Sequence, residues 1–287
     1  MASDWLFVDG SSLIFRAFYG VPRSVRSPDG RPINAVRGFV DTLARIITSR
    51  QPGHIAVASD EDWRPQWRVE LIPGYKAHRT AEPVPPELEP QMPVIHEVLD
   101  AIGIDFLGIA DYEAEDVIAT WTATASGTVE IVSGDRDLFA LIEDPRVCVL
   151  YPEKGGLAVV TEAEVTRRYG IPGRSYADYA ILRGDPSDGL PGLKGVGAVA
   201  AADMIRRHGG VAGLLRDGRL REDQREYLSR ALRVVPPVAG LPVPLPEGRR
   251  DSYPVEPERL AALEETHGVA SATGHLVQAL TRNQQRQ

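Results

Sequence analysis

The sequence predicts an α/β fold in which a mostly parallel central sheet is flanked by helices. Four short apolar runs, rich in β-branched residues, lack the polar alternation of a sheet with one solvated face, which is typical of parallel strands covered on both faces. The predicted strands are Trp5–Val8, His54–Ala58, Val129–Val132 and Val147–Leu150. Helical patterns separate them, and an alternation of strands and helices indicates right-handed crossovers within one sheet.

Helices are expected between these strands. Apolar residues recur at helical spacing from Val36 to Ile47 and from Ile95 to Ile102, and residues 112–125 are a further candidate. Near the fourth strand, Thr161 and Glu164 form a capping box for a helix that ends near Gly170.

The chain becomes mostly helical after about residue 165. Residues 175–182 and 198–207 predict two helices joined by a turn rich in Gly and Pro, and Pro236–Pro246 resembles a linker. Two short helices, around 256–266 and 270–282, follow the linker.

A polar, Pro-rich insertion at about 61–93 interrupts the alternation of strands and helices, and it is long for a loop inside a compact domain. Such loops are usually functional or mobile. The expected organisation is an α/β core at 1–165 that contains this insertion, a helical region at 166–235, and a linker with C-terminal helices at 236–287.

Composition excludes several classes of protein. The chain has 287 residues, of which 43% are hydrophobic, enough for a sizeable core. No run of 18 apolar residues occurs, which excludes a membrane-spanning helix, and the N-terminus lacks the features of a secretory signal. The single cysteine, Cys148, excludes an internal disulfide and fits a reducing compartment. We therefore expect a cytoplasmic protein without a membrane partner.

The formal charge of −8 argues against a protein that coats nucleic acid, but this charge is unevenly distributed. Residues 1–80 carry +3 and residues 166–287 carry +4, whereas residues 81–165 hold 3 basic and 18 acidic residues, a net charge of −15. Apolar strands interrupt the acidic block, so it is not a solvating tail.

Acidic residues follow three of the predicted strands, where open α/β sheets bind their ligands. Asp9 and Asp60 each follow a strand directly, and Asp135 and Asp137 follow Val129–Val132 closely. Two further acidic groups lie at the start of a helix and after Gly184. The nine carboxylates are Asp9, Asp60, Glu113, Glu115, Asp116, Asp135, Asp137, Asp185 and Asp188.

A single Asp after a strand more often caps a helix or forms a turn, and Glu113 with Asp116 could simply stabilise a helix N-terminus. Nine carboxylates at one sheet edge, however, would repel one another unless cations neutralise them. Mg²⁺ prefers carboxylates, waters and substrate phosphate as ligands, and so large a set favours a two-metal phosphodiester site. No His or Cys cluster has zinc spacing.

The glycine turn Gly192-Leu-Lys194-Gly195-Val-Gly197 allows two interpretations. Its spacing and the absence of a preceding strand make it a poor dinucleotide fingerprint. The turn could present backbone N–H groups to a DNA phosphate at the start of a helix, or it could be an ordinary helical hairpin in which Gly allows close packing.

Five motifs in this order resemble the bacterial 5′-3′ exonuclease or flap endonuclease family, which includes the N-terminal nuclease domain of bacterial DNA polymerase I. The resemblance covers about residues 4–235. The motifs are Leu6-Phe-Val-Asp-Gly-Ser-Ser12 with Arg16-Ala-Phe-Tyr19, Tyr75-Lys-Ala-His-Arg79, Tyr112-Glu-Ala-Glu-Asp-Val-Ile-Ala-Thr120, Ser133-Gly-Asp-Arg-Asp-Leu138, and Gly184-Asp-Pro-Ser-Asp-Gly-Leu-Pro-Gly192 running into Gly195-Val-Gly197.

The resemblance implies a PIN-like flap-endonuclease core with a helical arch at 61–93 and a helix-turn-helix variant at about 175–207 that grips duplex DNA. It implies a nuclease of replication and repair that acts on DNA with 5′ flaps, nicks or 5′ ends and leaves a 5′-phosphate. Two or three Mg²⁺ or Mn²⁺ ions would bind the nine carboxylates. The first metal group would be Asp9, Asp60, Glu113, Glu115 and Asp116, and Asp135, Asp137, Asp185 and Asp188 would complete the site around a second metal. Because no polymerase follows residue 287, we expect a stand-alone enzyme, and we assume a monomer.

The resemblance also implies roles for further residues. Lys76 and Arg79 would lie on the arch and stabilise charge on the scissile phosphate, and Arg68 fits the basic residue that leads into the arch. Tyr75 could stack on an unpaired base or pack within the arch. The DNA-contacting turn would comprise Gly192, Lys194, Gly195 and Gly197, and a K⁺ ion would bind backbone carbonyls of Ser187, Leu190 and Val196.

Three features depart from the family pattern. Glu115 stands where Asp is more usual, Asp60 is followed by two more acidic residues, and Ala198-Val199-Ala200 replaces the common Pro, Lys and Thr after the glycine turn. The last departure predicts a weaker grip on phosphate.

Three alternatives to a DNA nuclease stay open at the level of sequence. A non-catalytic DNA-binding protein would bind DNA in EDTA and cleave none. A haloacid-dehalogenase-like phosphatase would need Asp-x-Asp after the first strand, but Asp9-Gly10-Ser11 lacks the second Asp. An RNA-cleaving domain with a similar acidic edge is the third.

Overall fold

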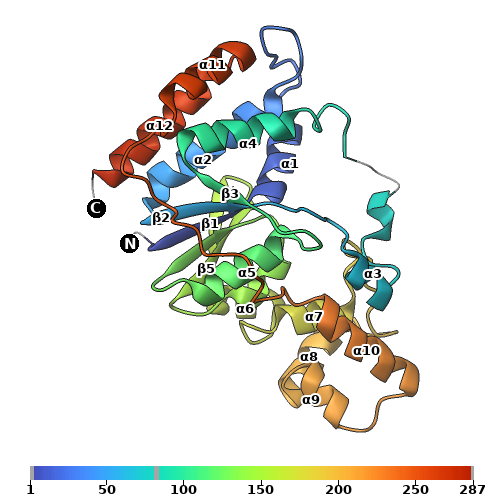
Figure 1. The fold of residues 1–287 in the computed structure, drawn as a ribbon. Helices are drawn as coiled ribbons and strands as arrows, with labels where there is room; N and C mark the ends of the chain where they lie inside the picture. Colours follow the sequence, from blue (N-terminus) through green and yellow to red (C-terminus); the bar gives the residue numbers. More distant parts are fainter. Residues whose placement is uncertain (1–2, 81–83, 286–287) are drawn as a thin grey trace.

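The computed structural model describes residues 3–80 and 84–285 and contains a six-stranded sheet of order β3-β2-β1-β4-β5-β6 (Figure 1). Strands β1 to β5 pair in parallel, and β6 pairs antiparallel with β5. The strands are β1 (Trp5–Asp9), β2 (His54–Ala58), β3 (Asp105–Leu107), β4 (Val129–Val132), β5 (Val147–Glu153) and β6 (Gly156–Val160). The predicted α/β class and all four predicted strands are confirmed.

Strands β3 and β6 were not predicted from the sequence. The three residues of β3 are half-buried, and β6 leaves two of its five residues exposed. The run in β3 has only three residues and includes Asp105. The apolar run Leu157–Val160 in β6 is as long as those of the predicted strands, so its signal was present in the sequence and was overlooked.

Each face of the sheet is covered by its own hydrophobic core. Leu6 and Val8 of β1 face one core, while Trp5 and Phe7 face the other, as the two-residue period of a strand requires. The first core is completed by α1 (Gly10–Gly20), α2 (Asn34–Arg50), α4 (Gln91–Ile102), α11 (Pro257–His267) and α12 (Ala270–Gln284). The second includes α5 (Ala114–Thr124), the 3₁₀ helix η2 (Asp137–Leu141) and α6 (Glu162–Tyr169).

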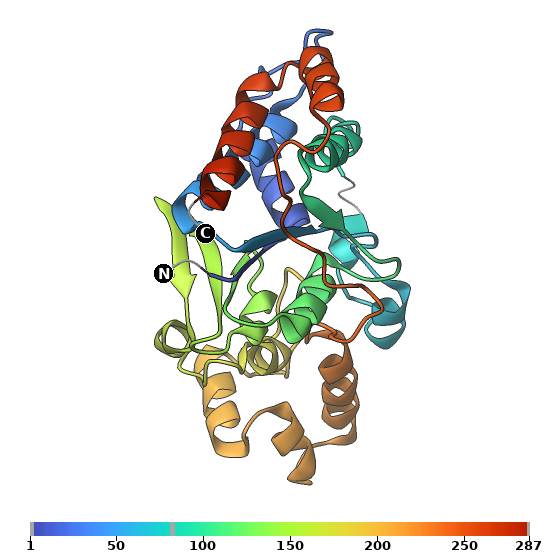
Figure 2. The same cartoon turned by 60° about the vertical axis from the view of Figure 1, so that its left-hand side comes forward.

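Most helices match the periodicity of the sequence. Thr161 caps α6, with its hydroxyl accepting a hydrogen bond from the Glu164 backbone N–H, and Gly170 ends the helix in the left-handed conformation. The other predicted helices correspond to α2, α4, α5, α7 (Tyr176–Arg183), α8 (Ala198–His208), α11 and α12. Helices α9 (Val211–Arg216) and α10 (Glu222–Val234) complete the helical region, which lies at the end of the molecule opposite α11 and α12 (Figure 2).

The insertion at 61–93 forms α3 (Gln66–Leu71) and the 3₁₀ helix η1 (Ala77–Thr80). Residues 81–83 of this expected arch lie outside the described residues. Arg68 of α3 donates a hydrogen bond from Nε to the carbonyl of Val234 at the end of α10, at 3.0 Å. The base of the insertion is therefore joined to the helical region.

The segment after α10, where the sequence predicts a linker, has no helix or strand until α11, and it is bonded to the core. Val238 donates its backbone N–H to Asp116, Trp121 donates to the Pro244 carbonyl, and Ile55 donates to the Gly248 carbonyl. Helices α11 and α12 then pack on the α4 and α2 side of the sheet. Within the described residues, we find no helix with the length and apolarity that crossing a membrane requires.

Candidate active site

The carboxyl end of β1 positions Asp9. The chain turns directly from β1 into α1, and Asp9 caps this helix by accepting a hydrogen bond from the Ser12 backbone N–H at 2.9 Å. Gly10 makes the turn possible, because a Cβ at this position would lie 2.7 Å from the Ala58 carbonyl oxygen. Ser133, after β4, donates its hydroxyl to Asp9 Oδ2 at 2.5 Å.

Asp60 lies next to Asp9, after β2. Its backbone N–H donates to the Ser11 hydroxyl at 3.1 Å, and its Oδ1 accepts from the Ala114 backbone N–H at 2.7 Å. Because β1 and β2 are adjacent and parallel, their carboxyl ends lie at the same sheet edge, and the start of α5 joins them there. The sequence predicts this arrangement.

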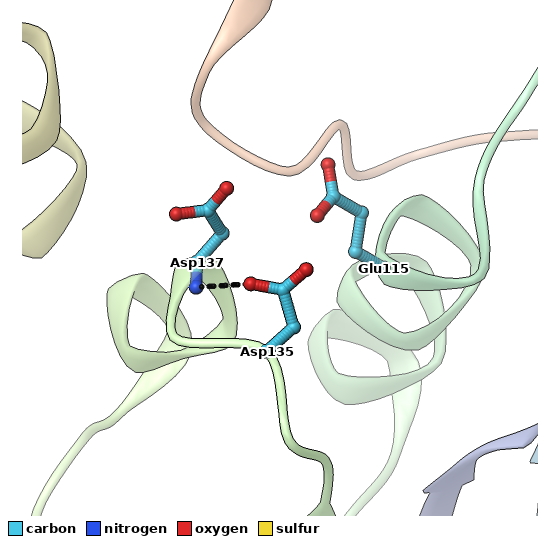
Figure 3. A group of neighbouring side chains, drawn as sticks. All are labelled: Glu115, Asp135 and Asp137. Carbon is cyan, nitrogen blue, oxygen red and sulfur yellow. Dashed lines mark hydrogen bonds between the residues drawn. The ribbon is translucent and has the colours of Figure 1, made fainter. Parts of the chain in front are cut away.

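Three carboxylates converge at the centre of this edge (Figure 3). Glu115 extends from α5, Asp135 follows β4, and Asp137 begins η2. One carboxylate oxygen from each lies within 4.8 Å of the others. The Asp137 backbone N–H donates to Asp135 Oδ1 at 3.0 Å, which fixes the loop that carries both acids.

The loop before the glycine turn adds Asp185 and Asp188, both buried. Asp188 and Asp137 each shift the pKa of the other, so Asp188 extends the acidic group formed by Glu115, Asp135 and Asp137. Asp185 accepts from the Ser187 backbone N–H and lies 3.9 Å from the Arg136 guanidinium. The structure thus brings Asp188 to the edge and gives Asp185 a local partner.

The buried carboxylates have perturbed pKa values. Burial, followed by the charge of Asp60, raises the pKa of Asp9 to about 7. Burial and neighbouring acids raise the pKa of Asp135 and raise that of Asp137 well above its ordinary value. Burial also raises the Glu115 pKa despite the opposing charge of Arg68. For Asp188, burial is outweighed by Lys76 and by the hydrogen bond with Asp137, so its pKa is lowered.

These shifts describe buried carboxylates that also repel one another. The donors at this edge are carboxylate oxygens, which suit hard divalent cations such as Mg²⁺ and Mn²⁺. The residues present therefore fit a divalent-metal site at Glu115, Asp135 and Asp137.

Glu113 and Asp116 are engaged by cations from the insertion, an arrangement that differs from the expected ligand role. Both Asp116 oxygens accept from Arg68, at 2.7 and 2.9 Å, and Asp116 has no exposed surface. Glu113 accepts from Arg68, Lys76 and the Tyr75 hydroxyl. In this conformation both carboxylates are already paired with protein cations, which would compete with a metal ion for them.

The arch residues are more buried than the sequence suggested. Arg68, expected as a catalytic basic residue that leads into the arch, is completely buried and contacts carboxylates, with Glu115 3.2 Å away. Tyr75 is 2% exposed and has no free ring face for a base, which corresponds to the packing alternative. Arg79 is half-exposed, with its guanidinium 3.7 Å from Asp188. It is the arch cation placed between the acidic edge and solvent.

The glycine turn is partly committed to packing. Gly192 has φ of 68° and donates its N–H to the Tyr227 hydroxyl at 3.2 Å. Lys194, Gly195 and Gly197 are exposed, and Val199 at the start of α8 is 77% exposed. These exposed positions agree with a surface turn at a helix N-terminus. The Leu190 carbonyl, one of the three expected K⁺ ligands, accepts from the Asp185 N–H.

Three serines that sequence reasoning did not single out organise the edge: Ser11, Ser12 and Ser133. Ser12 accepts from the Gly134 N–H at 3.0 Å, and Ser133 accepts from the Asp135 N–H at 2.8 Å. All three lie inside the Asp-Gly-Ser-Ser and Ser-Gly-Asp motifs, so the motif spacing was the available signal.

Comparison with known proteins gives consistent results. A family model described as the N-terminal resolvase-like domain of 5′-3′ exonuclease matches residues 4–170. A 5′-3′ exonuclease from Streptomyces coelicolor is 46% identical over 96% of this chain and 100% of its own length. DNA polymerase I of Mycobacterium bovis is 41% identical over 73% of this chain. The aligned region covers 24% of that polymerase.

Solved structures include a T5 flap endonuclease in a pseudo-enzyme–product complex with DNA and metal ions. The likeness has a TM-score of 0.66 at 17% identity and covers 98% of each chain. At this identity it shows a shared fold.

Proposed function

The chain belongs to the 5′-3′ exonuclease family, and we propose that it is a divalent-metal-dependent 5′ nuclease that hydrolyses DNA at flaps, nicks and 5′ ends. In this proposal it acts both as a flap endonuclease and as a 5′-3′ exonuclease, in replication and repair. The observation that carries the proposal is the convergence of Glu115, Asp135 and Asp137 at the carboxyl edge of the sheet.

The three converging carboxylates would hold the first divalent ion, Mg²⁺ or Mn²⁺. Asp188 extends the group through Asp137, and Asp9 and Asp60 flank it, so these acids supply capacity for a second ion. Ions held by these acids would supply an activated water as nucleophile and would neutralise charge on the leaving 3′ oxygen. A K⁺ ion at the glycine turn remains part of the proposal, supported by the family resemblance.

The protein side chains have separable roles in this proposal. Ser12 and Ser133 hold Asp9 and the Asp135 loop in place. Arg79 lies where it can contact a phosphate held at the acidic edge. Arg68 and Asp116 are positioning residues, because their pair joins α3, α5 and the segment after α10.

The test is cleavage of a DNA substrate with a labelled 5′ flap in Mg²⁺ or Mn²⁺ by the wild type and by Asp137→Asn and Asp188→Asn. Each substitution removes one anionic ligand with little change in volume. We expect each to reduce kcat/KM by at least about 100-fold, the order of loss seen when one group that stabilises the transition state is removed. Wild-type-like cleavage by both variants would refute the two-metal assignment.

Substrate comparison tests the finer claims. Flap, nicked, blunt and RNA substrates of equal length distinguish flap endonuclease, exonuclease and RNA-cleaving activity. Binding to flap DNA in EDTA, with no cleavage in any divalent ion, would instead indicate a non-catalytic DNA-binding protein.

A further inference from the structure

Lys76 is a buried lysine in contact with the acidic edge. Its side chain is 4% exposed, its ammonium group is hydrogen-bonded to Glu113, and Asp188 Oδ1 lies 3.9 Å from Nζ. Its backbone N–H also donates to the Asp188 carbonyl at 2.9 Å. The side chain is thus directed into the protein, away from the solvent where substrate would arrive.

The two buried cations of the insertion differ in how firmly they are held. Arg68 contacts Glu113, Glu115 and Asp116 and donates to the Val234 carbonyl, so it is fixed on all sides. The Lys76 ammonium has one carboxylate at hydrogen-bonding distance, a second at the limit of an ion pair, and the Tyr75 ring centroid 5.0 Å away. Among the described residues, it has no backbone carbonyl partner comparable to the Val234 carbonyl of Arg68. Lys76 is therefore the cation that can leave.

The backbone at Lys76 supports the same conclusion. Its φ of 47° lies in the left-handed region, which a lysine rarely adopts. Contacts with Glu113 and Asp188 therefore hold the docked conformation against the intrinsic preference of the chain. The following 3₁₀ helix, η1, has no buried residue, so the adjoining segment offers little packing to resist movement.

We propose that Lys76 is a built-in counter-ion of the metal-free acidic edge and that divalent ions displace it, so that metal loading frees Lys76 for the substrate phosphate. This inference rests on the proposed function, since it needs metal at Glu115, Asp135 and Asp137. The charge of Lys76 acts on both Asp135 and Asp188. A divalent ion at Glu115, Asp135 and Asp137 would repel the ammonium and screen its attraction to Asp135 and Asp188. The hydrogen bond to Glu113, which lies outside that group of acids, is then the contact that has to break.

The chain offers a direct readout because it contains only three lysines, Lys76, Lys154 and Lys194. Lys154 and Lys194 are exposed and serve as internal references. The full-length protein is treated briefly with an amine-acylating reagent in EDTA or in Mg²⁺, at matched ionic strength set with KCl, and modification of each lysine is measured by mass spectrometry. We expect Mg²⁺ to raise labelling of Lys76 relative to the references by about tenfold, as a shift between docked and free states predicts.

Two variants sharpen the test. Glu113→Gln removes the carboxylate that holds the ammonium and should expose Lys76 to labelling even in EDTA. Lys76→Met removes an internal competitor and should tighten Mg²⁺ binding, measured calorimetrically without DNA, by about fivefold. The matched control Lys154→Met, at an exposed lysine outside the site, should leave Mg²⁺ affinity unchanged.

The outcomes separate this inference from the proposed function. If Mg²⁺ binds in the calorimeter but Lys76 stays as protected as in EDTA, the counter-ion role is overturned and the metal site stands. If Mg²⁺ does not bind at all, the metal site and the counter-ion role fail together. Should Glu113→Gln not fold, the wild-type labelling and the Lys76→Met affinity still decide.

Discussion

Replacing Arg68 with Met tests whether the buried cation at the base of the insertion holds the fold together. The substitution keeps most of the side-chain volume but removes the charge that faces Glu113, Glu115 and Asp116. It also removes the donor to the Val234 carbonyl. Removal of one partner from a buried ion pair costs about 3–5 kcal/mol, because the remaining charge is left uncompensated. We expect the free energy of unfolding to fall by about this amount.

The loss of stability in Arg68→Met should depend on pH. Burial already raises the pKa of Glu113 and Glu115, and loss of Arg68 raises both further. An acid whose pKa is higher in the folded than in the unfolded state destabilises the fold increasingly as the pH rises from its unfolded pKa toward its folded pKa. The deficit of the variant should therefore be larger at pH 8 than at pH 5.

The assay is urea unfolding followed by far-ultraviolet circular dichroism, in EDTA, at both pH values. Arg167→Ala is the control, because Arg167 is 70% exposed and pairs with Glu164 on the surface of α6. Such pairs contribute about 0–1 kcal/mol. A loss below about 1 kcal/mol for Arg68→Met, comparable with this control, would contradict the argument from burial. An equal loss at pH 5 and pH 8 would show that the charge of the carboxylates is not the cause.

Three further predictions concern single positions. Because burial raises the Asp9 pKa to about 7, the metal-free protein should lose stability as the pH rises from about 4 to 7. In thermal melts in EDTA, Asp9→Asn should lose less stability over this pH range than the wild type. An unchanged pH profile would count against the raised pKa of Asp9. Gly10→Ala should lower the free energy of unfolding by about 1–3 kcal/mol, since the added Cβ would lie 2.7 Å from the Ala58 carbonyl oxygen. The control is Gly20→Ala at the end of the same helix, where no atom lies within 4 Å of the added Cβ. It should be neutral or slightly stabilising in the same urea titrations. Equal losses of unfolding free energy in the two variants would contradict the steric argument. Val199→Lys should strengthen duplex binding in Ca²⁺, because it adds one cation at an exposed position. The slope of log binding constant against log salt concentration should steepen by about one unit. An unchanged slope would exclude contact with DNA phosphate at this position.

The acidic block noted in the sequence has a structural explanation. Five of its acids, Glu113, Glu115, Asp116, Asp135 and Asp137, lie in or beside the candidate site. A net charge of −8 therefore does not exclude DNA as a partner. In the proposed function, metal ions neutralise the edge that would otherwise repel the scissile phosphate.

The sequence by itself determined the central strands and the edge where the acids gather. Buried parallel strands require continuous apolar runs, and the ligands of such sheets bind at the carboxyl ends of the strands. The sequence alone therefore placed Asp9, Asp60 and Asp135 at this edge. Local signals also placed α6 correctly, because its cap and its final glycine lie within the helix's own sequence.

Only the tertiary structure decided which carboxylates share a space and which are already paired. Glu113 and Glu115 are two residues apart, yet Glu113 accepts from Lys76 while Glu115 joins Asp135 and Asp137. Arg68 reaches Asp116 across 48 residues and Val234 across 166. Such pairings depend on how the insertion, α5 and α10 dock on one another, and a docking geometry has no counterpart in local periodicity or spacing.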